Sequence, residues 1–189
     1  WERLETIYNK LTAVEADAEI ELNLRLGQIC YETGDYSTSA IRCKRAFRLA
    51  KLRCRPKHQG DALMRLGSIY RDRSRWETAK RLYNASLTQY HRSKDHIGTM
   101  AAKTNIGLLA YLKGDWASAN TILSDALELA EECQNDKGIA ICSGNLGNVA
   151  YAEGRNEEAI EFYHTSLKFN HKIRSPLGIA EIETNMGLI

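Results

Sequence analysis

The feature that most constrains the fold of this chain is a Leu-Gly-like pair that recurs every 40 residues. The pair stands at Leu26-Gly27, Leu66-Gly67, Ile106-Gly107, Leu146-Gly147 and Met186-Gly187. Self-similarity at a fixed period of about 20 to 50 residues is typical of repeat arrays. In such an array each unit buries its apolar face against its neighbours, and 189 residues hold enough units to do so. The period therefore predicts stacked repeats in place of a single central core.

Each period contains the pattern of two helices. In the first whole unit Ile20, Leu26 and Ile29 follow helical spacing, and Gly34 suits the left-handed turn after a helix. Asp35 can cap the next helix, which again has one apolar face. The second helices of the later units are predicted to begin near Trp76, Trp116 and Asn156. The predicted fold class is all-α, built from antiparallel helix pairs.

The 40-residue register also predicts where repeats begin and end. We expect a single repeat array over residues 1–189: the end of a truncated repeat at 1–16, repeats at 17–55, 56–95, 96–135 and 136–175, and the start of a fifth at 176–189. Asp95, Asn135 and Ser175 are good N-cap residues, and Pro56 and Pro176 suit the first helical position. Because the chain starts without Met and stops inside a repeat, we expect it to be a piece of a longer protein.

Four of the repeated glycines are predicted to lie in the middle of a helix, where Gly costs roughly 1 kcal/mol relative to Ala. A cost that recurs in every unit indicates that the second helix approaches the first closely. The second helices offer small residues for this contact, at Ser39, Ala79, Ala119, Ala159, Ala46, Ser86, Ala126 and Ser166. Between these small residues stand Cys43, Tyr83, Leu123 and Tyr163, which supply bulk.

These residues resemble the tetratricopeptide repeat, whose pattern is L-G-x-x-Y, then A-x-x-x-F, then a small residue. Here it reads Leu66-Gly67-Ser68-Ile69-Tyr70, then Ala79 to Tyr83, then Ser86. The usual Trp before Leu-Gly and the usual Pro after the second helix are absent. With its period of 40 and the stretch Gly-Asn-Leu-Gly-Asn at 144–148, the chain looks most like the Leu-Gly-Asn-rich, Pins-type spindle-orientation adaptors. Bacterial peptide-sensing regulators also use long repeats. The resemblance implies a right-handed α-solenoid that acts as a protein–protein interaction scaffold.

In this family the first helices line a concave groove, so the resemblance implies groove residues. The peptide-binding groove is expected at Arg25, Gln28, Arg65, Thr104, Asn105, Leu108, Asn145, Asn148, Thr184 and Asn185. Three asparagines share one register, and an Asn amide can donate to and accept from a peptide backbone at once. The alternative is that these amides only bond to neighbouring helices. The positions of the family's chaperone-tail clamp hold other residues, so that activity is not predicted.

The charge of the chain is unevenly distributed, although the formal net charge is only +2. Residues 1–40 carry −5, residues 41–103 carry +13 and residues 104–189 carry −6. The predicted basic patch comprises Arg42, Lys44, Arg45, Arg48, Arg71, Arg73 and Arg75. It suits an acidic protein partner, anionic lipid or a second copy bound end to end. Nucleic acid is not favoured because no aromatic residues interleave the basic ones. The alternative is a solvated outer face.

No motif of a catalytic site is present, so the chain is predicted to be a non-enzymatic scaffold that binds a peptide or disordered segment without a cofactor. The five cysteines and five histidines have no metal-ligand spacing, and the odd cysteine count suits a reducing, cytoplasmic location. No apolar run approaches the ~20 residues of a membrane span. Two alternative functions remain: the sensor region of a signalling or transcriptional regulator, and basic-surface binding of nucleic acid or anionic lipid.

Overall fold

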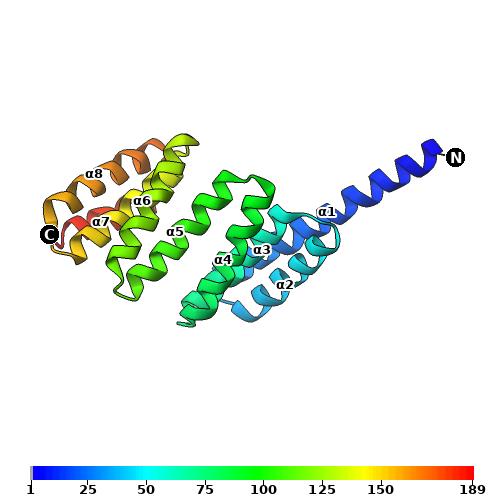
Figure 1. Cartoon of the computed structure of the whole chain (residues 1–189), viewed down its shortest axis with the longest axis horizontal. Coiled ribbons are helices and arrows are strands. Elements are labelled where there is room, and N and C mark those ends of the chain that lie inside the picture. Colours follow the sequence, from blue (N-terminus) through cyan, green and yellow to red (C-terminus); the bar gives the residue numbers. More distant parts are fainter. Residues whose placement is uncertain (1) are drawn as a thin grey trace. The chain divides into compact units, whose positions relative to one another are not determined.

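A computed structural model describes the backbone from Glu2 to Ile189 and the side chains from Asp17 onward. These residues form helices and no strand, so the chain is all-α, as predicted (Figure 1). The helices are α1 (Glu2–Glu32), α2 (Tyr36–Leu52), α3 (Pro56–Asp72), α4 (Trp76–Ser93), α5 (His96–Leu112), α6 (Trp116–Glu132), α7 (Asp136–Ala152), α8 (Asn156–Lys172) and α9 (Pro176–Met186). The second helices begin at the residues that the register predicted.

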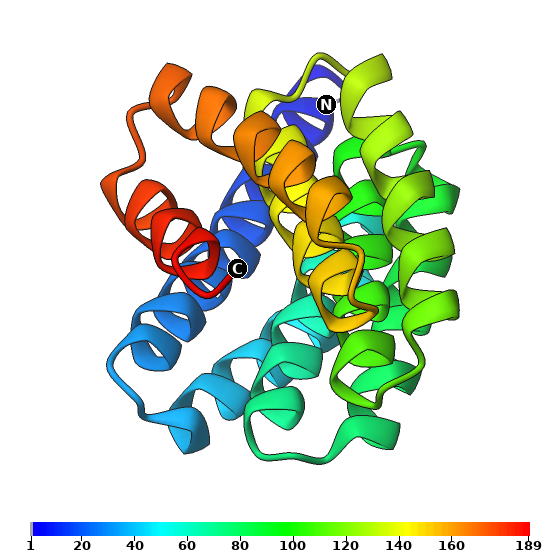
Figure 2. The ribbon, with the colours of Figure 1, turned by 90° about the vertical axis from the view of Figure 1, so that its left-hand side faces the viewer.

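The chain divides into two compact units, Trp1–Asp95 and His96–Ile189, which we call unit 1 and unit 2. In unit 1, α1 pairs with α2 and α3 pairs with α4, and α3 also packs against α1 and α2. In unit 2, α5 pairs with α6 and α7 pairs with α8, while α7 also packs against α5 and α6. After α8 the chain turns and α9 packs against α8 (Figure 2).

The repeat boundaries themselves remain a prediction. The backbone of α1 is one continuous helix from Glu2 to Glu32, without a turn near residue 16. How residues 1–16, predicted as the end of a truncated repeat, pack against their neighbours depends on side chains outside the described residues. Within the part of the chain that the structure describes, every helix is too short or too polar to span a lipid bilayer.

Local capping explains where the helices begin. The side chains of Asp35, Asn135 and Ser175 each accept a hydrogen bond from the backbone N–H three residues further on. Pro56 and Pro176 occupy the first turn, where a missing N–H leaves no helical hydrogen bond unmade. These start signals act within a few residues, so the sequence alone could place them.

The turn from the first to the second helix of a pair uses one left-handed residue. Gly34, Gly114 and Gly154 have φ of 82°, 76° and 76°. Ser74 occupies the equivalent position between α3 and α4 with φ of 56°. A Cβ in this region clashes with the backbone and costs roughly 1–2 kcal/mol, so Ser74 is the strained member of the series.

Replacement of Ser74 by glycine should therefore stabilise unit 1. We expect the free energy of unfolding to rise by about 0.5–1 kcal/mol, since the gain in the folded state is partly offset by the freer unfolded chain. Urea denaturation followed by circular dichroism measures the change. Gly114→Ser is the matched control. A Cβ at Gly114 meets no atom within 4 Å, so the substitution adds only backbone strain and should lower the free energy of unfolding. A change of the same sign in both variants would contradict the explanation.

The predicted close approach at the repeated glycines is confirmed, and the structure shows which atoms make the contact. A Cβ added at Gly67 would lie 2.4 Å from Cε1 of Tyr83, and one at Gly147 would lie 2.5 Å from Cε1 of Tyr163. In each repeat the nearest atom belongs to the bulky residue of the second helix, in the pairs Gly27–Cys43, Gly67–Tyr83, Gly107–Leu123 and Gly147–Tyr163. The eight small residues of the second helices are fully buried beside this contact. Glycine is needed because a side chain, and not the opposing backbone, fills the space above it.

Candidate functional site: a pocket between α7, α8 and α9

The described part of unit 2 contains a cavity of about 310 Å³ between α7, α8 and α9. Ile141, Asn145 and Asn148 line it from α7, and Leu177 and Glu181 line it from α9. The last turns of α8 close its base. Two of the predicted groove residues, Asn145 and Asn148, thus meet in one cavity.

The walls of this pocket combine exposed apolar side chains with separated charges. Ile141 is 46% exposed on α7 and Leu177 is 80% exposed on α9. Lys137 and Glu181 are also exposed and lie on the same two helices. Pockets that bind ligands typically combine apolar walls with a few polar groups that fix orientation. The arrangement is suited to an apolar side chain whose backbone lies beside polar groups.

Asn145 supplies such a polar group. It is half-buried, and its side chain makes no hydrogen bond within the described residues. Asn105 at the same register differs, because its Nδ2 donates to the carbonyl of Ala101 at 2.9 Å. Asn145 and Asn105 thus share a register, but only the amide of Asn105 bonds to the backbone of its own helix.

Asn148 has a structural role instead. Its Oδ1 accepts hydrogen bonds from the Tyr163 hydroxyl at 2.7 Å and from Nδ2 of Asn185 at 3.0 Å. These contacts join α7, α8 and α9. Burial raises the pKa of Tyr163 to about 12, so its hydroxyl stays protonated and can donate at neutral pH. The amides of Asn148 and Asn185 thus bond between neighbouring helices, which was the alternative to binding a peptide. These hydrogen bonds hold one wall of the pocket in place.

In unit 1 the predicted groove residues already have hydrogen-bond or ion-pair partners. Arg25 forms an ion pair with Glu21 at 3.1 Å. Arg65 donates to Oε1 of Gln28, and Nε2 of Gln28 donates to Glu32. Of these contacts, only the one between Arg65 and Gln28 connects α1 with α3, and the other two lie within α1. A ligand there would have to displace these existing partners.

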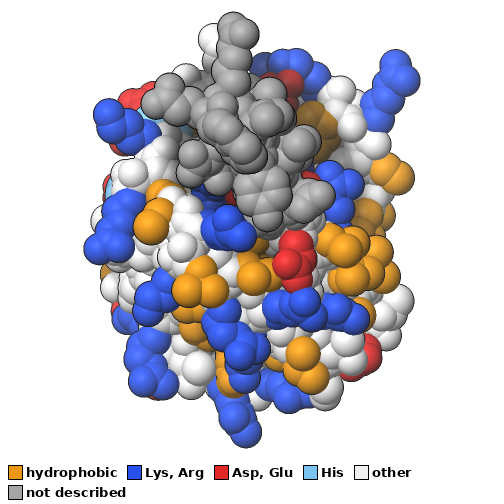
Figure 3. Space-filling model, turned by 90° about the vertical axis from the view of Figure 1, so that its right-hand side faces the viewer, with side chains coloured by type: hydrophobic (Ala, Val, Ile, Leu, Met, Phe, Trp, Pro, Cys, Tyr) orange, Lys and Arg blue, Asp and Glu red, His pale blue; other side chains and the backbone are white. Residues whose placement is uncertain are grey.

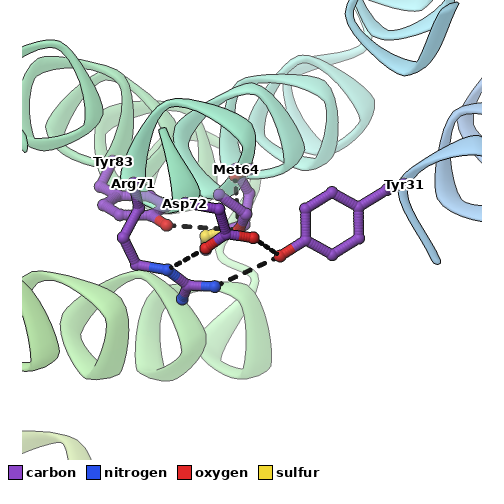
Figure 4. A network of polar contacts seen from close by, with 6 residues as sticks. Tyr31, Met64, Arg71, Asp72 and Tyr83 are labelled. Atoms are coloured by element: carbon purple, nitrogen blue, oxygen red, sulfur yellow. Dashed lines mark hydrogen bonds and ion pairs between the residues drawn. The ribbon is translucent and has the colours of Figure 1, made fainter. Parts of the chain in front are cut away.

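A second polar network lies at the C-terminal ends of α1 and α3 (Figure 4). The Tyr31 hydroxyl donates to Asp72, and Nε of Arg71 donates to the other carboxylate oxygen at 2.9 Å. Nη2 of Arg71 also lies 3.3 Å from the Tyr31 hydroxyl. Burial, reinforced by Asp72, raises the pKa of Tyr31 to about 12. Arg71, predicted as part of a basic patch, is thus tied into a structural contact between two helices.

Two threonines and one leucine of the predicted groove have other surroundings. Thr104 is only 8% exposed, and its hydroxyl donates to the Met100 carbonyl at 2.9 Å. It also lies 3.3 Å from Sγ of a buried cysteine on α7, so Thr104 does not belong to an open groove. Thr184 is exposed and bonds its own helix, while Leu108 is half-buried. The register placed all three on first helices, but Thr104 points into the core.

The predicted basic patch is spread over three elements. Lys44, Arg45 and Arg48 are exposed on α2, whereas Arg42 is half-buried. The last two patch residues, Arg73 and Arg75, flank the turn between α3 and α4, where Arg73 lies over a tyrosine ring at 5.7 Å. Within the described chain, groups of three His, Cys, Asp or Glu side chains suited to a metal ion are absent.

A buried acid of unit 1 gives a testable pH dependence that the sequence did not suggest. Asp61 accepts a hydrogen bond from the Tyr90 hydroxyl at 2.9 Å. Burial raises the pKa of Asp61, although this hydrogen bond and, to a smaller extent, the nearby His58, Lys57 and Arg65 act in the opposite direction. An acid whose pKa is higher in the folded than in the unfolded chain contributes stability at pH values below its unfolded-state pKa. This contribution is lost as the pH rises through the folded-state pKa.

Asp61→Asn should therefore stabilise unit 1 more at neutral than at acid pH, because it removes the cost of the buried charge and still accepts from Tyr90. Urea denaturation at several pH values measures the free energy of unfolding of variant and wild type. The two should be equally stable below the pKa that Asp61 has in the unfolded chain, and the variant should be more stable above the pKa that Asp61 has in the folded chain. Asp17→Asn is the control: Arg55 lowers the pKa of Asp17, so that substitution should lose stability at neutral pH. A pH-independent effect of Asp61→Asn would contradict the prediction.

The helices are paired antiparallel, and in each pair a glycine of the first helix contacts a side chain of the second helix. Such an arrangement defines an α-helical repeat protein. A family model described as tetratricopeptide repeat matches residues 58–132 and 98–172, which together span more than half of the chain. The chain therefore belongs to the tetratricopeptide repeat family, as the Leu-Gly register predicted. Arrays of this family serve as interaction scaffolds, and the chain is a scaffold of this kind. No curated protein sequence matches the chain.

Solved structures with the same fold include three bacterial proteins of low sequence identity. Aspartyl phosphate phosphatase F from Bacillus subtilis has a TM-score of 0.80 and 14% identity, over 88% of this chain and 44% of that one. The Rap conjugation gene regulator of plasmid pLS20, in complex with the Phr* peptide, has a TM-score of 0.80 and 19% identity, over 97% and 51%. BtubC from P. vanneervenii has a TM-score of 0.71 and 16% identity, over 85% and 66%. The chain thus spans 44–66% of their lengths.

Proposed function

We propose that unit 2 binds an extended peptide segment of a partner protein in the pocket between α7, α8 and α9. In this proposal the amide of Asn145 bonds to the peptide backbone, and Ile141 and Leu177 contact an apolar side chain of the peptide. The observation that carries the proposal is the amide of Asn145, which has no partner in the described residues and lines an open cavity of about 310 Å³.

The dimensions of the pocket suit a short stretch of chain. Its volume is at the small end of the range of about 300–1,000 Å³ that is usual for ligand sites. Neighbouring helices lie about 10 Å apart, and an extended peptide covers that distance with about three residues. One apolar side chain can then enter the cavity while the adjacent peptide group meets Asn145, which can donate and accept at once.

The walls of the pocket are held in place before a ligand arrives. Tyr163, Asn148 and Asn185 connect the three helices by hydrogen bonds. Gly144 on α7 lies against Ile182 of α9, since a Cβ there would be 2.9 Å from the Cδ1 atom. A preformed surface leaves most of the ordering cost to the ligand, which is the usual case when a disordered segment binds.

Asn145→Ala should weaken peptide binding about tenfold, because up to two hydrogen bonds to the peptide backbone are lost. Phage-displayed random peptides would first be selected on the wild-type chain, and the affinity of a selected peptide would then be measured by fluorescence polarisation. Asn105→Ala is the matched control at the same register, since that side chain already bonds to its own helix. It should leave the affinity unchanged.

Ile141→Glu tests the apolar wall of the same pocket. An exposed carboxylate there should abolish binding of peptides with an apolar anchor, while circular dichroism shows an unchanged fold. If both Asn145→Ala and Ile141→Glu bind the selected peptide as tightly as the wild type, the pocket is not the binding site and the proposal fails.

A sensor region of a regulator is the second candidate. The observation in its favour is that the structural neighbours include a conjugation gene regulator solved in complex with a peptide. The same pocket would then receive a signal peptide in place of a segment of a partner protein. In the full-length protein, addition of the selected peptide should change the activity or the partner binding of a neighbouring module, whereas a scaffold would show only competition for the pocket.

A further inference from the structure

The solvent-facing side of α2 in unit 1 carries a stripe of basic residues with an apolar residue at each end. The stripe, called here the α2 stripe, consists of Ile41, Lys44, Arg48, Lys51 and Leu52, all of them exposed. Ile41 is 64% exposed and Leu52 is 79% exposed. Helix α2 contains no Asp or Glu. Figure 3 shows a face of the molecule on which Lys and Arg side chains gather, with few Asp and Glu among them.

The repeat itself does not require these charges. In α6 the positions of Arg48 and Lys51 are occupied by Glu128 and Glu131, which are equally exposed. The helix dipole favours a cation only in the last turn of α2, where Lys51 lies. Lys44 and Arg48 stand earlier in the helix, and neither forms an ion pair within the described residues. The contacts of the described residues thus do not account for the charge of the stripe.

Carboxylates already bind to basic side chains on this part of unit 1. Arg45, beside the stripe, pairs with Glu19 of α1 at 2.5 Å. Arg55, just after α2, donates two hydrogen bonds of 2.9 Å to the two carboxylate oxygens of Asp17. The planar guanidinium group matches a carboxylate in this bidentate manner. The basic residues Arg45 and Arg55 next to the stripe thus already bind acidic side chains of the chain itself.

We propose that the α2 stripe binds a carboxylate-rich polypeptide segment of a partner protein, flanked by apolar residues that contact Ile41 and Leu52. The stripe is about 16 Å long, because the helix rises about 1.5 Å at each step from Ile41 to Leu52. An extended chain covers that length with about five residues. The partner segment therefore has acidic residues in the middle and an apolar residue at either end. This site is separate from the pocket of unit 2.

Other anionic partners fit the stripe less well. Single-stranded nucleic acid is usually held by aromatic side chains among the basic ones, and the stripe has none. Membrane insertion needs a continuous apolar face. Ile41 and Leu52 are instead separated by the charged residues Lys44, Arg48 and Lys51. Neither class of partner would use both the cations and the two separated aliphatic side chains.

The proposal is tested with a fluorescein-labelled peptide in which leucines flank a run of glutamates. Fluorescence polarisation at low salt should show binding that Lys44→Ala with Arg48→Ala weakens about tenfold, since two exposed ion pairs are lost. His164→Ala with Lys168→Ala changes the equivalent exposed positions of α8 and should have no effect. Asn145→Ala should also have none, so a failure of this proposal is distinguishable from a failure of the pocket.

Three results would overturn the proposal. The first is that a peptide with glutamine in place of glutamate binds as tightly as the glutamate peptide, which would show that the stripe does not recognise carboxylates. The second is tighter binding of single-stranded DNA or phosphatidylserine vesicles that depends on Lys44 and Arg48. The third is self-association of the chain, seen by light scattering and lost in the Lys44→Ala, Arg48→Ala variant, which would assign the stripe to a second copy.

Discussion

Replacement of Gly67 by alanine is expected to destabilise unit 1 by about 1–2 kcal/mol, although alanine is the better helix former by about 1 kcal/mol. The reason is the ring of Tyr83. A Cβ at Gly67 would lie 2.4 Å from Cε1 and 2.6 Å from Cδ1 of that ring. Tyr83 is fully buried and its hydroxyl lies 3.2 Å from Oγ of Ser68, so the ring cannot move away without breaking other contacts. Urea denaturation measures the loss.

Gly187→Ala is the control for this prediction. Gly187 follows α9 with a φ of −68°, and a Cβ there would meet no atom nearer than 3.5 Å. Alanine at this position should therefore be neutral or stabilising. If both substitutions stabilise the chain, the contact with Tyr83 is not the reason for the repeated glycine.

A double-mutant cycle isolates the contact between the two residues. With Tyr83 replaced by alanine, the substitution Gly67→Ala should no longer be harmful, because the ring that it would strike is absent. The coupling free energy should then be at least about 1 kcal/mol, within the range for residues in direct contact. A coupling near zero would place the cost of Gly67→Ala in the backbone of α3.

Tyr163→Ala should have a still larger effect on unit 2, a loss of about 3–5 kcal/mol as for other large aromatic residues removed from a core. Tyr163 is 1% exposed, packs over Gly147 and donates its hydroxyl to Asn148. The substitution leaves a cavity above Gly147 and removes one hydrogen bond from the network that joins α7, α8 and α9. Hydrogen exchange should show the loss of protection in these helices.

Two milder variants separate packing from hydrogen bonding at this position. Tyr163→Phe keeps the ring and should cost only about 0.5–1.5 kcal/mol, because a single hydrogen bond is lost. Tyr163→Leu should fall between the two, since Leu123 fills the equivalent place above Gly107 in the preceding repeat. Equal losses for Tyr163→Phe and Tyr163→Ala would show that the hydrogen bond, and not the ring, holds the helices together.

Much of the fold was predictable because its signals are local or periodic. The caps at Asp35, Asn135 and Ser175 act within three residues. The left-handed turns at Gly114 and Gly154 follow from the lack of a Cβ. The pairing of helices follows from the 40-residue period, since every unit must bury the same face. These features depend on the chain near each residue or on its register.

The candidate site was predictable only in part. The register placed Asn145 and Asn148 on a first helix, and both line the pocket. It also grouped them with Thr104, which is buried, and with Arg65, which is bonded to Gln28. Residues that share a register share a face of the helix, but their hydrogen-bond partners come from other helices and differ between repeats. Leu177 and Glu181 were missed because the sequence gives no sign that α9 closes the pocket.

The helices, their caps, their pairing and the recurring position of glycine can all be read from the amino-acid sequence. These features depend on the preferences of the backbone and on the 40-residue period, and not on the individual contacts between side chains. Three features are visible only in the folded chain: Tyr83 and Tyr163 lie over those glycines, the amide of Asn145 lines a cavity, and Arg71 forms an ion pair with Asp72. The physical reason is that packing and hydrogen bonding depend on distances between side chains of different helices, which a repeat register does not contain.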